Sequence, residues 1–428
     1  MPHTLLTLNY DVLSQILALV SPHDAVRLAL ASRAAYALAL PRIVSDVTLG
    51  GLYHKPGGSA LSQLTAFTNF VLSPAPAWLG APSARLDALH SLHIMRDAVR
   101  VRKDGVWTVD SNAASLLSAV IARARNLQKL TLWGSDALFA AFPDFGLDSS
   151  PSIHTLVLGG DVPPLPVLAH AFPHVRTLEF IAGGGSCAPD WALFTANEMC
   201  DAAALGAWQQ KLDRVDAGFP ILPLACPVRR VDLRNPLVSD TYMLFCAREY
   251  LRRTRPVVLS ASVSSELTEE ELCAVLDGEV VAPGLRFLEL VGDRCKGVKE
   301  GSEWMTHVAN TLSTLQVPIL GISLSVTPSI PPMVVPSALK ASHELIRTPT
   351  ATSDPIDLVA LARTIVEHAP SLRFVALDLS SAPGGVAGKP KQAWFRVYDA
   401  GKERKVEQIS ENEGREMQRE MRAFNRWD

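Results

Sequence analysis

The sequence predicts an α/β solenoid, in which parallel strands form a concave sheet and helices lie outside it, with a three-helix head at the N-terminus. The first observation is a short apolar strand that recurs along the chain, with apolar residues at its first, fourth and sixth positions. The second is that most segments between the copies can supply a return helix, as a strand–helix repeat requires. The third is the stretch 8–40, which has a strong helical pattern and no strand signal.

Composition narrows the class of protein. With 428 residues, 48% of them hydrophobic, the chain can bury a large core. A net charge of -3 gives no reason to expect a nucleic-acid or anionic-membrane partner. The six cysteines are scattered without a C-x-x-C pair, as expected of free thiols in a reducing compartment. No signal peptide and no membrane-spanning run is recognisable, so we expect a cytoplasmic or nuclear protein without a cofactor.

The head is predicted from helical periodicity. Val12, Leu13, Ile16 and Leu17 recur at three- and four-residue spacing and form one apolar stripe. Three helices in about 33 residues are too few for an independent core, since domains below about 40 residues usually need a staple or a partner. The head, residues 1–48, is therefore expected to pack against another part of the chain or against a partner protein.

The boundaries of the head helices follow from capping residues. Ser21 is a good N-cap for the second helix and is followed by Pro22, which suits a first helical position. Ser32 is expected to cap the third helix, and Pro41 is expected to end it.

The stretch L-N-Y-D-V-L-x-x-I-L-A-L-V-S-P-H-D-A-V-R-L-A-L-A-S-R-A-A-Y, residues 8–36, resembles the F-box. This short helical module docks to the adaptor subunit of cullin-based SCF ubiquitin ligases. The sequence departs from the family pattern at Asn9, where the family usually has Pro, and at Tyr36, where it often has Trp. The resemblance implies a set of adaptor-binding residues: Leu8, Val12, Leu13, Ile16, Leu17, Leu28 and Tyr36. The alternative is that the stripe packs on the first repeat and the head is an end cap.

The repeated strand defines a predicted solenoid over residues 89–380, preceded by a linker and N-terminal cap at 49–88. Its strands start about 22 to 38 residues apart, or about 53 to 57 where a weak or unrecognised copy intervenes. This spacing resembles that of the larger leucine-rich repeats, which implies an irregular array. The clear copies are 89–94, 127–132, 153–158, 175–180, 228–233, 285–290 and 369–379, and the weaker ones are 256–260 and 319–324.

The connecting segments and the tail complete the predicted array. Helices are expected at 61–72, 113–125, 165–172, 265–276, 302–312 and 356–368. Residues 327–355 are rich in Pro, Ser and Thr and read as a long loop. The tail, residues 381–428, is predicted to be a strand hairpin followed by a charged helix at 411–424, which would cap the apolar end of the array.

Because successive side chains of a strand point to opposite faces, the residues between the core positions line the concave face. Aromatic and Arg residues there are the types that anchor protein interfaces. The alternative is that neighbouring strands half-cover the aromatic rings and that the charges are merely solvated. The predicted target-binding residues are His93, Lys129, Trp133, Glu179, Arg230, Asp232, Phe287 and Glu289.

No catalytic or metal-binding residues are predicted. Gly184–Ala188 resembles a nucleophile elbow around Ser186 but lacks its last glycine, so a loop between repeats is favoured. His90 and His93 are three apart on a strand and face opposite sides, which prevents a shared metal there.

Together the two resemblances imply the substrate-recognition subunit of an SCF ubiquitin ligase. The head would bind the adaptor, the concave face would bind an unknown target protein, and the chain itself would not be an enzyme. The alternative is a repeat scaffold or ligand-sensing receptor with no link to a ligase.

Overall fold

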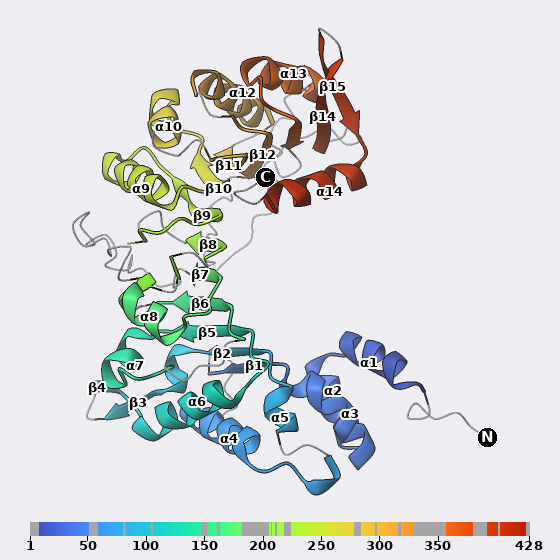
Figure 1. Ribbon diagram of the computed structural model, residues 1–428, viewed down its shortest axis with the longest axis vertical. Coiled ribbons are helices and arrows are strands. Elements are labelled where there is room, and N and C mark those ends of the chain that lie inside the picture. The colour runs from blue at the N-terminus through green and yellow to red at the C-terminus, as the bar shows by residue number, and fades with distance from the viewer. Residues whose placement is uncertain are drawn as a thin grey trace, which may run out of the picture. The chain divides into compact units, whose positions relative to one another are not determined.

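A computed structural model shows a mixed α/β protein built on mostly parallel sheet (Figure 1). Its described residues form two compact units, one from Met1–Leu193 and Cys200–Leu212, the other from Phe194–Met199 and Asp213–Asp428. The second unit therefore begins inside the region predicted to be one repeat array. The residues described are 8–50, 59–79, 83–103, 106–146, 152–160, 163–181, 205–206, 208–209, 212–217, 224–277, 284–295, 298–315, 318–328, 357–379, 392–400 and 403–424.

The first unit opens with the three predicted helices, α1 (Tyr10–Leu19), α2 (Pro22–Ala29) and α3 (Arg33–Val44). Ser21 and Ser32 cap α2 and α3 as predicted, because each hydroxyl accepts a backbone N–H three residues on. Asn9 caps α1 through its side-chain oxygen, which accepts from the N–H of Asp11 at 3.1 Å.

The prediction that Pro41 ends the third helix is wrong. The helix continues to Val44 with Pro41 inside it. Packing explains the continuation, because Leu40 and Val44, on either side of the proline, are both buried in a cluster with Ala88. The burial of these two side chains offsets the hydrogen bond that proline cannot donate.

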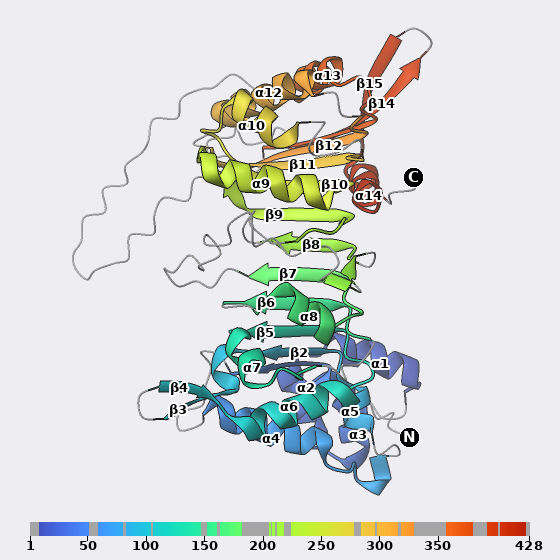
Figure 2. The ribbon, with the colours of Figure 1, turned by 60° about the vertical axis from the view of Figure 1, so that its left-hand side comes forward.

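The parallel sheet of the first unit follows chain order. Each strand pairs with the next copy along the chain, as in Ser91↔Lys129 and Lys129↔Thr155. The helices α6, α7 and α8 lie against one face of this sheet (Figure 2). The strands are β1 (Asp46–Leu49), β2 (Ser91–Ile94), β5 (Lys129–Trp133), β6 (Thr155–Gly159) and β7 (Thr177–Ile181). The helices are α4 (Ala60–Leu72), α5 (Ala84–Asp87), α6 (Ser111–Arg123), α7 (Asp136–Ala141) and α8 (Leu165–Ala171), with short 3₁₀ turns at Ala77–Leu79 and Arg96–Ala98.

The first unit also contains a hairpin that the sequence analysis did not predict. Strands β3 (Arg100–Lys103) and β4 (Val106–Val109) pair antiparallel to each other. Val106 and Trp107 on β4 are exposed. The hairpin was not predicted because its strands do not follow the repeated apolar pattern.

The second unit has the same arrangement of parallel strands and ends in an antiparallel hairpin. Its strands are β8 (Arg214–Ala217), β9 (Arg230–Leu237), β10 (Val258–Ser264), β11 (Phe287–Cys295), β12 (Gly321–Pro328) and β13 (Phe374–Asp378), all parallel, then β14 (Gln392–Ala400) and β15 (Glu403–Ile409). Its helices are α9 (Thr241–Thr254), α10 (Glu269–Leu276), α12 (Val298–Thr314), α13 (Leu358–His368) and α14 (Glu411–Arg422).

All nine predicted strand copies coincide with observed strands, and their fourth and sixth residues are buried, as Leu288 and Leu290 are in β11. The predicted C-terminal hairpin and helix are also observed. In the described part of the second unit, the strand β8 and the long helix α9 were not predicted. The helices α9, α10 and α12 lie on one side of the sheet, whereas α14 lies on the other (Figure 1).

Candidate protein-docking surfaces

The first helix divides its apolar residues between two sides. Leu13 and Leu17 are buried, with Leu13 only 5% exposed, and they hold α1 to the rest of the first unit. Both were predicted to bind the adaptor, and this stays a prediction for two residues that are buried in the chain alone. Both lie on the stripe identified from the sequence, and periodicity alone does not say which part of a wide stripe faces inward.

The other side of α1 presents a continuous apolar row. Val12 is 45% exposed and Ile16 is 37% exposed, and the spacing of four residues places them on one face. Leu8 and Leu19 extend the row in both directions, and Leu19 is 90% exposed. The exposed row consists of Leu8, Val12, Ile16 and Leu19, and we call it the α1 row. Three of its four members were predicted to bind the adaptor.

Helix α2 adds two exposed apolar residues that were not among the predicted adaptor-binding residues. Val26 and Leu30 are four residues apart and therefore share a face, and Leu30 is 83% exposed. Leu28, which was predicted to bind the adaptor, is half-buried. This exposed pair could have been predicted from the sequence, because Val26 and Leu30 are four residues apart in a segment otherwise rich in polar residues.

Tyr36 is half-buried and packs against other residues of the first unit. Its ring meets that of Trp78 edge to face at 5.5 Å, and it packs on the cluster that contains Leu40 and Val44. That Tyr36 contacts the adaptor stays a prediction. Its aromatic ring joins α3 to the segment before β2.

The predicted target-binding residues of the first unit lie on the strand faces as expected and are half-exposed. His93 on β2 lies 3.1 Å from Asp46 through Nε2, and Lys129 on β5 lies 3.9 Å from Glu179 on β7. Trp133 covers Gly159 on the neighbouring strand, where a Cβ would stand 2.5 Å from the indole ring. Each of these side chains thus contacts a residue of another strand.

In the second unit, the predicted charged residues form a ladder of alternating sign across the sheet. Arg214 donates from Nε to Asp232 at 2.6 Å, Arg230 approaches the other oxygen of Asp232 at 2.8 Å, and Arg230 also donates to Glu289 at 3.4 Å. Ser260 lies between Asp232 and Glu289 in the register. Its small side chain leaves Arg230 room to reach across strand β10.

The ladder continues at both ends. On β8, Asp216 accepts from Arg234 at 2.6 Å, while burial raises the pKa of its carboxyl because desolvation outweighs the nearby guanidinium groups. At the far end, Arg422 of α14 donates to Glu289 at 2.7 Å, and Gln418 donates to the same oxygen at 3.1 Å. Residues of the C-terminal helix therefore supply the last hydrogen bonds of the ladder.

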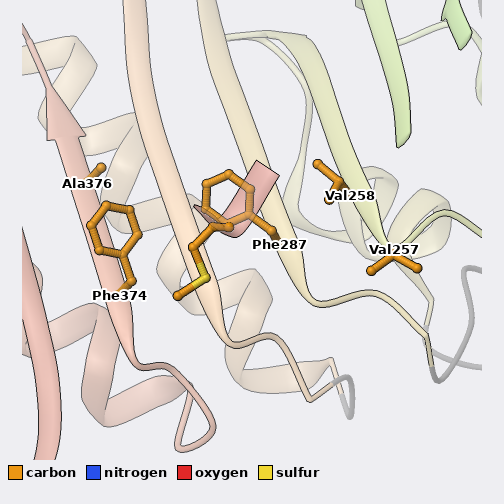
Figure 3. Close-up of a cluster of buried hydrophobic side chains, with 6 residues drawn as sticks. Val257, Val258, Phe287, Phe374 and Ala376 are labelled. Atoms are coloured by element: carbon orange, nitrogen blue, oxygen red, sulfur yellow. The ribbon is translucent and has the colours of Figure 1, made fainter. Parts of the chain in front are cut away.

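Helix α14 also buries the apolar part of this face. Phe287 and Phe374 lie on neighbouring parts of the sheet and point into one cluster with Ala376, Val257 and Val258 (Figure 3). Met421 of α14 is the member of this cluster that comes from the helix, and the partly buried Met417 packs against it. Phe287 is fully buried as a result.

The residues of this unit that were predicted to bind a target are engaged within the chain. Phe287, Glu289 and Asp232 are buried and engaged within the chain, and Arg230 is occupied by two carboxylates. The sequence analysis placed these residues on the correct face of each strand. It took α14 for a cap at the end of the array, whereas the helix packs on the face itself.

A pocket of about 330 Å³ remains between α14 and the sheet. From the helix, Arg415, Gln418 and Arg422 line it, at a spacing that places them on one helical face. From the sheet it is lined by Arg230, Gln392 and Trp394 and by residues with hydroxyl or carboxylate groups. The latter are Ser260, Ser323, Ser325, Glu289 and Asp378. Helix α14 covers this part of the face without filling it.

Metal-ligand clusters and membrane-crossing helices were both sought among the described residues. It holds no group of three His, Cys, Asp or Glu side chains placed to bind a metal ion. None of the described helices is both long and apolar enough to cross a bilayer. The segment Gly184–Ala188, considered above as a nucleophile elbow, lies outside the described residues, as does nearly all of the predicted loop at 327–355.

Comparison with known proteins does not assign the chain. No model of a protein family matches it, and no curated protein matches it significantly.

Proposed function

We propose that this chain is an F-box-like substrate receptor with a leucine-rich-repeat body. In this proposal the head docks to the adaptor subunit of an SCF ubiquitin ligase and the strand face of the repeats holds a target protein. The protein catalyses no bond chemistry itself and acts by raising the effective concentration of the target near the ligase.

The observation that carries the proposal is the exposed α1 row, Leu8, Val12, Ile16 and Leu19. A soluble helix normally turns such a row inward. Here Leu13 and Leu17 are the buried residues of α1, so the exposed row does not contribute to the packing of the unit. Exposed apolar groups of this kind mark protein-interaction sites.

Within the head, α3 packs on other elements whereas α1 and α2 carry exposed apolar residues, and this difference supports docking by α1 and α2. Helix α3 packs on the segment before β2 through Leu40 and Val44 and leads directly into β1. It therefore already serves as the end cap that the alternative scaffold function would require of the whole head. The first two helices carry the exposed apolar residues and do not lead into the strand array.

The test is co-purification of the full chain with the adaptor after a Val12→Asp, Ile16→Asp double substitution. Both residues are exposed, so the fold should survive while the adaptor is lost. The matched control is Val106→Asp on β4, a valine of the same unit that is 63% exposed. Retention of the adaptor by the double variant would refute the assignment.

A further inference from the structure

We propose that the pocket between α14 and the sheet of the second unit binds a neutral polyhydroxylated ligand, a saccharide, while α14 stays in place. Such a site goes beyond the proposed function, because it takes a small ligand and uses only residues of the second unit. Four features of the pocket support it: the short side chains that leave it open, the charges already engaged around it, the hydroxyl and carbonyl groups that remain, and an aromatic surface.

The pocket is open because short side chains stand between long ones on one face of the sheet. In the strand register, one row across five strands consists of Ser260, Glu289, Ser323, Ala376 and Trp394. The two serines and the alanine are short, so about 330 Å³ remains between this face and α14. This volume is at the small end of the range for ligand pockets, about 300–1,000 Å³, and it limits the ligand to a small molecule.

A second row extends the pocket along the same strands. It consists of Val291, Ser325, Asp378 and Gln392, which stand opposite one another in the register. Each lies two residues from a member of the first row, and side chains two apart on a strand share a face. The two rows therefore form a continuous, mostly polar floor.

The charged groups around the pocket are already engaged. Glu289 accepts hydrogen bonds from Arg230 and Arg422, and Arg415 pairs with a glutamate of its own helix. Asp378 accepts a hydrogen bond at 2.6 Å from the amide of the glutamine opposite it on β14. An added anion would face two carboxylates, and an added cation would face three guanidinium groups. These charges favour a ligand that carries none.

Hydroxyl and carbonyl oxygens remain to bind such a ligand. Within the described part of the chain, no protein group bonds to the side-chain hydroxyl of Ser260 or Ser325. Gln418 donates its amide N–H groups to Glu289 and Ser323, which leaves its carbonyl oxygen as an acceptor. A saccharide hydroxyl can donate and accept at the same time, so it satisfies both kinds of group.

Trp394 adds an aromatic surface to this polar lining. Its side chain is half-buried, and it packs so closely on Gly414 of α14 that a Cβ there would overlap it. The helix therefore holds the indole in position. The face of an aromatic ring carries partial negative charge, which attracts the polarised C–H bonds of a sugar ring. This surface favours a cyclic saccharide over an acyclic polyol.

The experiment titrates the full chain with four neutral sugars, D-glucose, D-mannose, D-galactose and N-acetylglucosamine, and follows binding by ligand-observed NMR. At least one should bind with a Kd on the order of 1 mM, as ordinary ligand efficiency gives for about 12 non-hydrogen atoms. Glucuronate should bind at least about tenfold more weakly than glucose, because its carboxylate meets those of the pocket. Sorbitol, which has no ring and must be ordered on binding, should also bind more weakly. Amide exchange in α14 should slow when the sugar binds, since the ligand bridges the helix and the sheet.

Two variants locate the ligand. Ser260→Ala with Ser325→Ala removes two hydroxyls that make no bond within the described chain, and it should weaken binding by about tenfold. The matched control is Ser262→Ala, on the same strand and face as Ser260 but outside the pocket, which should bind as wild type does. The second variant, Ser325→Leu, fills the pocket and should abolish binding while α14 stays protected from exchange.

Free sugars and the terminal sugars of a glycoprotein share this chemistry, and an array of immobilised glycans distinguishes them. Capture on the array identifies a glycan as the source, whereas binding of free sugar alone identifies a free saccharide. The proposal is overturned if neither the four sugars nor the array binds the wild type, or if binding survives in both pocket variants. Tighter binding of glucuronate than of every neutral sugar also overturns it, by showing an anion site. None of these measurements includes the adaptor, so failure here is distinguishable from failure of the proposed function.

Discussion

Arg422, in the last turn of the C-terminal helix, donates from Nη2 to Oε1 of Glu289 at 2.7 Å across 133 residues of sequence. Glu289 is buried in the middle of strand β11, whereas Arg422 is partly exposed. This ion pair fixes α14 on the strand face that was predicted to bind a target. The accessibility of that face therefore depends on the helix.

Arg422→Ala should loosen α14. The substitution removes a charged hydrogen bond to a buried carboxylate, which contributes about 1–3 kcal/mol. Amide hydrogen exchange within α14 should accelerate by about tenfold, which corresponds to about 1.4 kcal/mol. Arg419→Ala is the control, because Arg419 is exposed and pairs only with Glu416 of the same helix, and it should leave the exchange rates within about twofold. Equal effects of the two substitutions would contradict the role given to Glu289.

The two sides of α1 should respond differently to truncation. Leu13→Ala removes buried methyl groups and should cost about 2–4 kcal/mol, seen as faster hydrogen exchange in α3. Val12→Ala alters an exposed side chain and should change stability by no more than about 0.5 kcal/mol. If Val12→Ala were as disruptive as Leu13→Ala, the α1 row would be part of the core and the docking surface would not exist.

Acid should weaken helix α9 through Glu249. Hydrogen bonds from Arg252, and then from Arg253, lower the pKa of Glu249 to about 2 from an ordinary value of 4.5, although partial burial opposes the shift. Because the folded-state pKa lies below the unfolded one, the contribution to stability is complete above about pH 4.5 and disappears as the pH falls toward about 2. Glu249→Gln should flatten the pH dependence of α9 hydrogen-exchange protection in this window. An unchanged pH profile would show that the three side chains do not interact in solution.

Cys295 should be inert toward alkylation in the native protein. The thiol is buried at the end of β11, and burial raises its pKa to about 11, so almost no thiolate is present at pH 8. Iodoacetamide at pH 8 should label Cys295 only after denaturation, as read by peptide mass spectrometry. Cys273, which is half-exposed, provides the internal comparison. Rapid native labelling of Cys295 would contradict its burial.

The sequence pattern was sufficient to predict the strands because each copy repeats the same spacing of apolar residues. An apolar residue at the fourth and sixth positions must be buried, so the register of β5, β6 and β11 follows from a few leucines. The missed strand β8 has the same pattern in Leu212, Val215 and Ala217, all buried. It was overlooked because its apolar residues are mixed with the charges of Arg214 and Asp216, which serve the ladder.

The candidate sites were less predictable, because accessibility depends on contacts between segments distant in sequence. Phe287 looks like an exposed anchor on a strand until Met421 is placed over it. Tyr36 fits an adaptor-binding pattern, and its ring also meets that of Trp78 from a separate segment. In α1 the stripe was recognised correctly, but the choice between Leu13 and Val12 for the inward side needs the position of α3. A one-dimensional pattern does not contain that information.

The central claim, that the head binds an SCF adaptor through its exposed apolar row, is tested most directly by a pull-down of the purified full chain with the adaptor. The account predicts that wild type and Val106→Asp retain the adaptor, while Val12→Asp with Ile16→Asp loses it and keeps the wild-type unfolding profile. Undiminished adaptor capture by the double variant, or no capture by the wild type, would contradict the account.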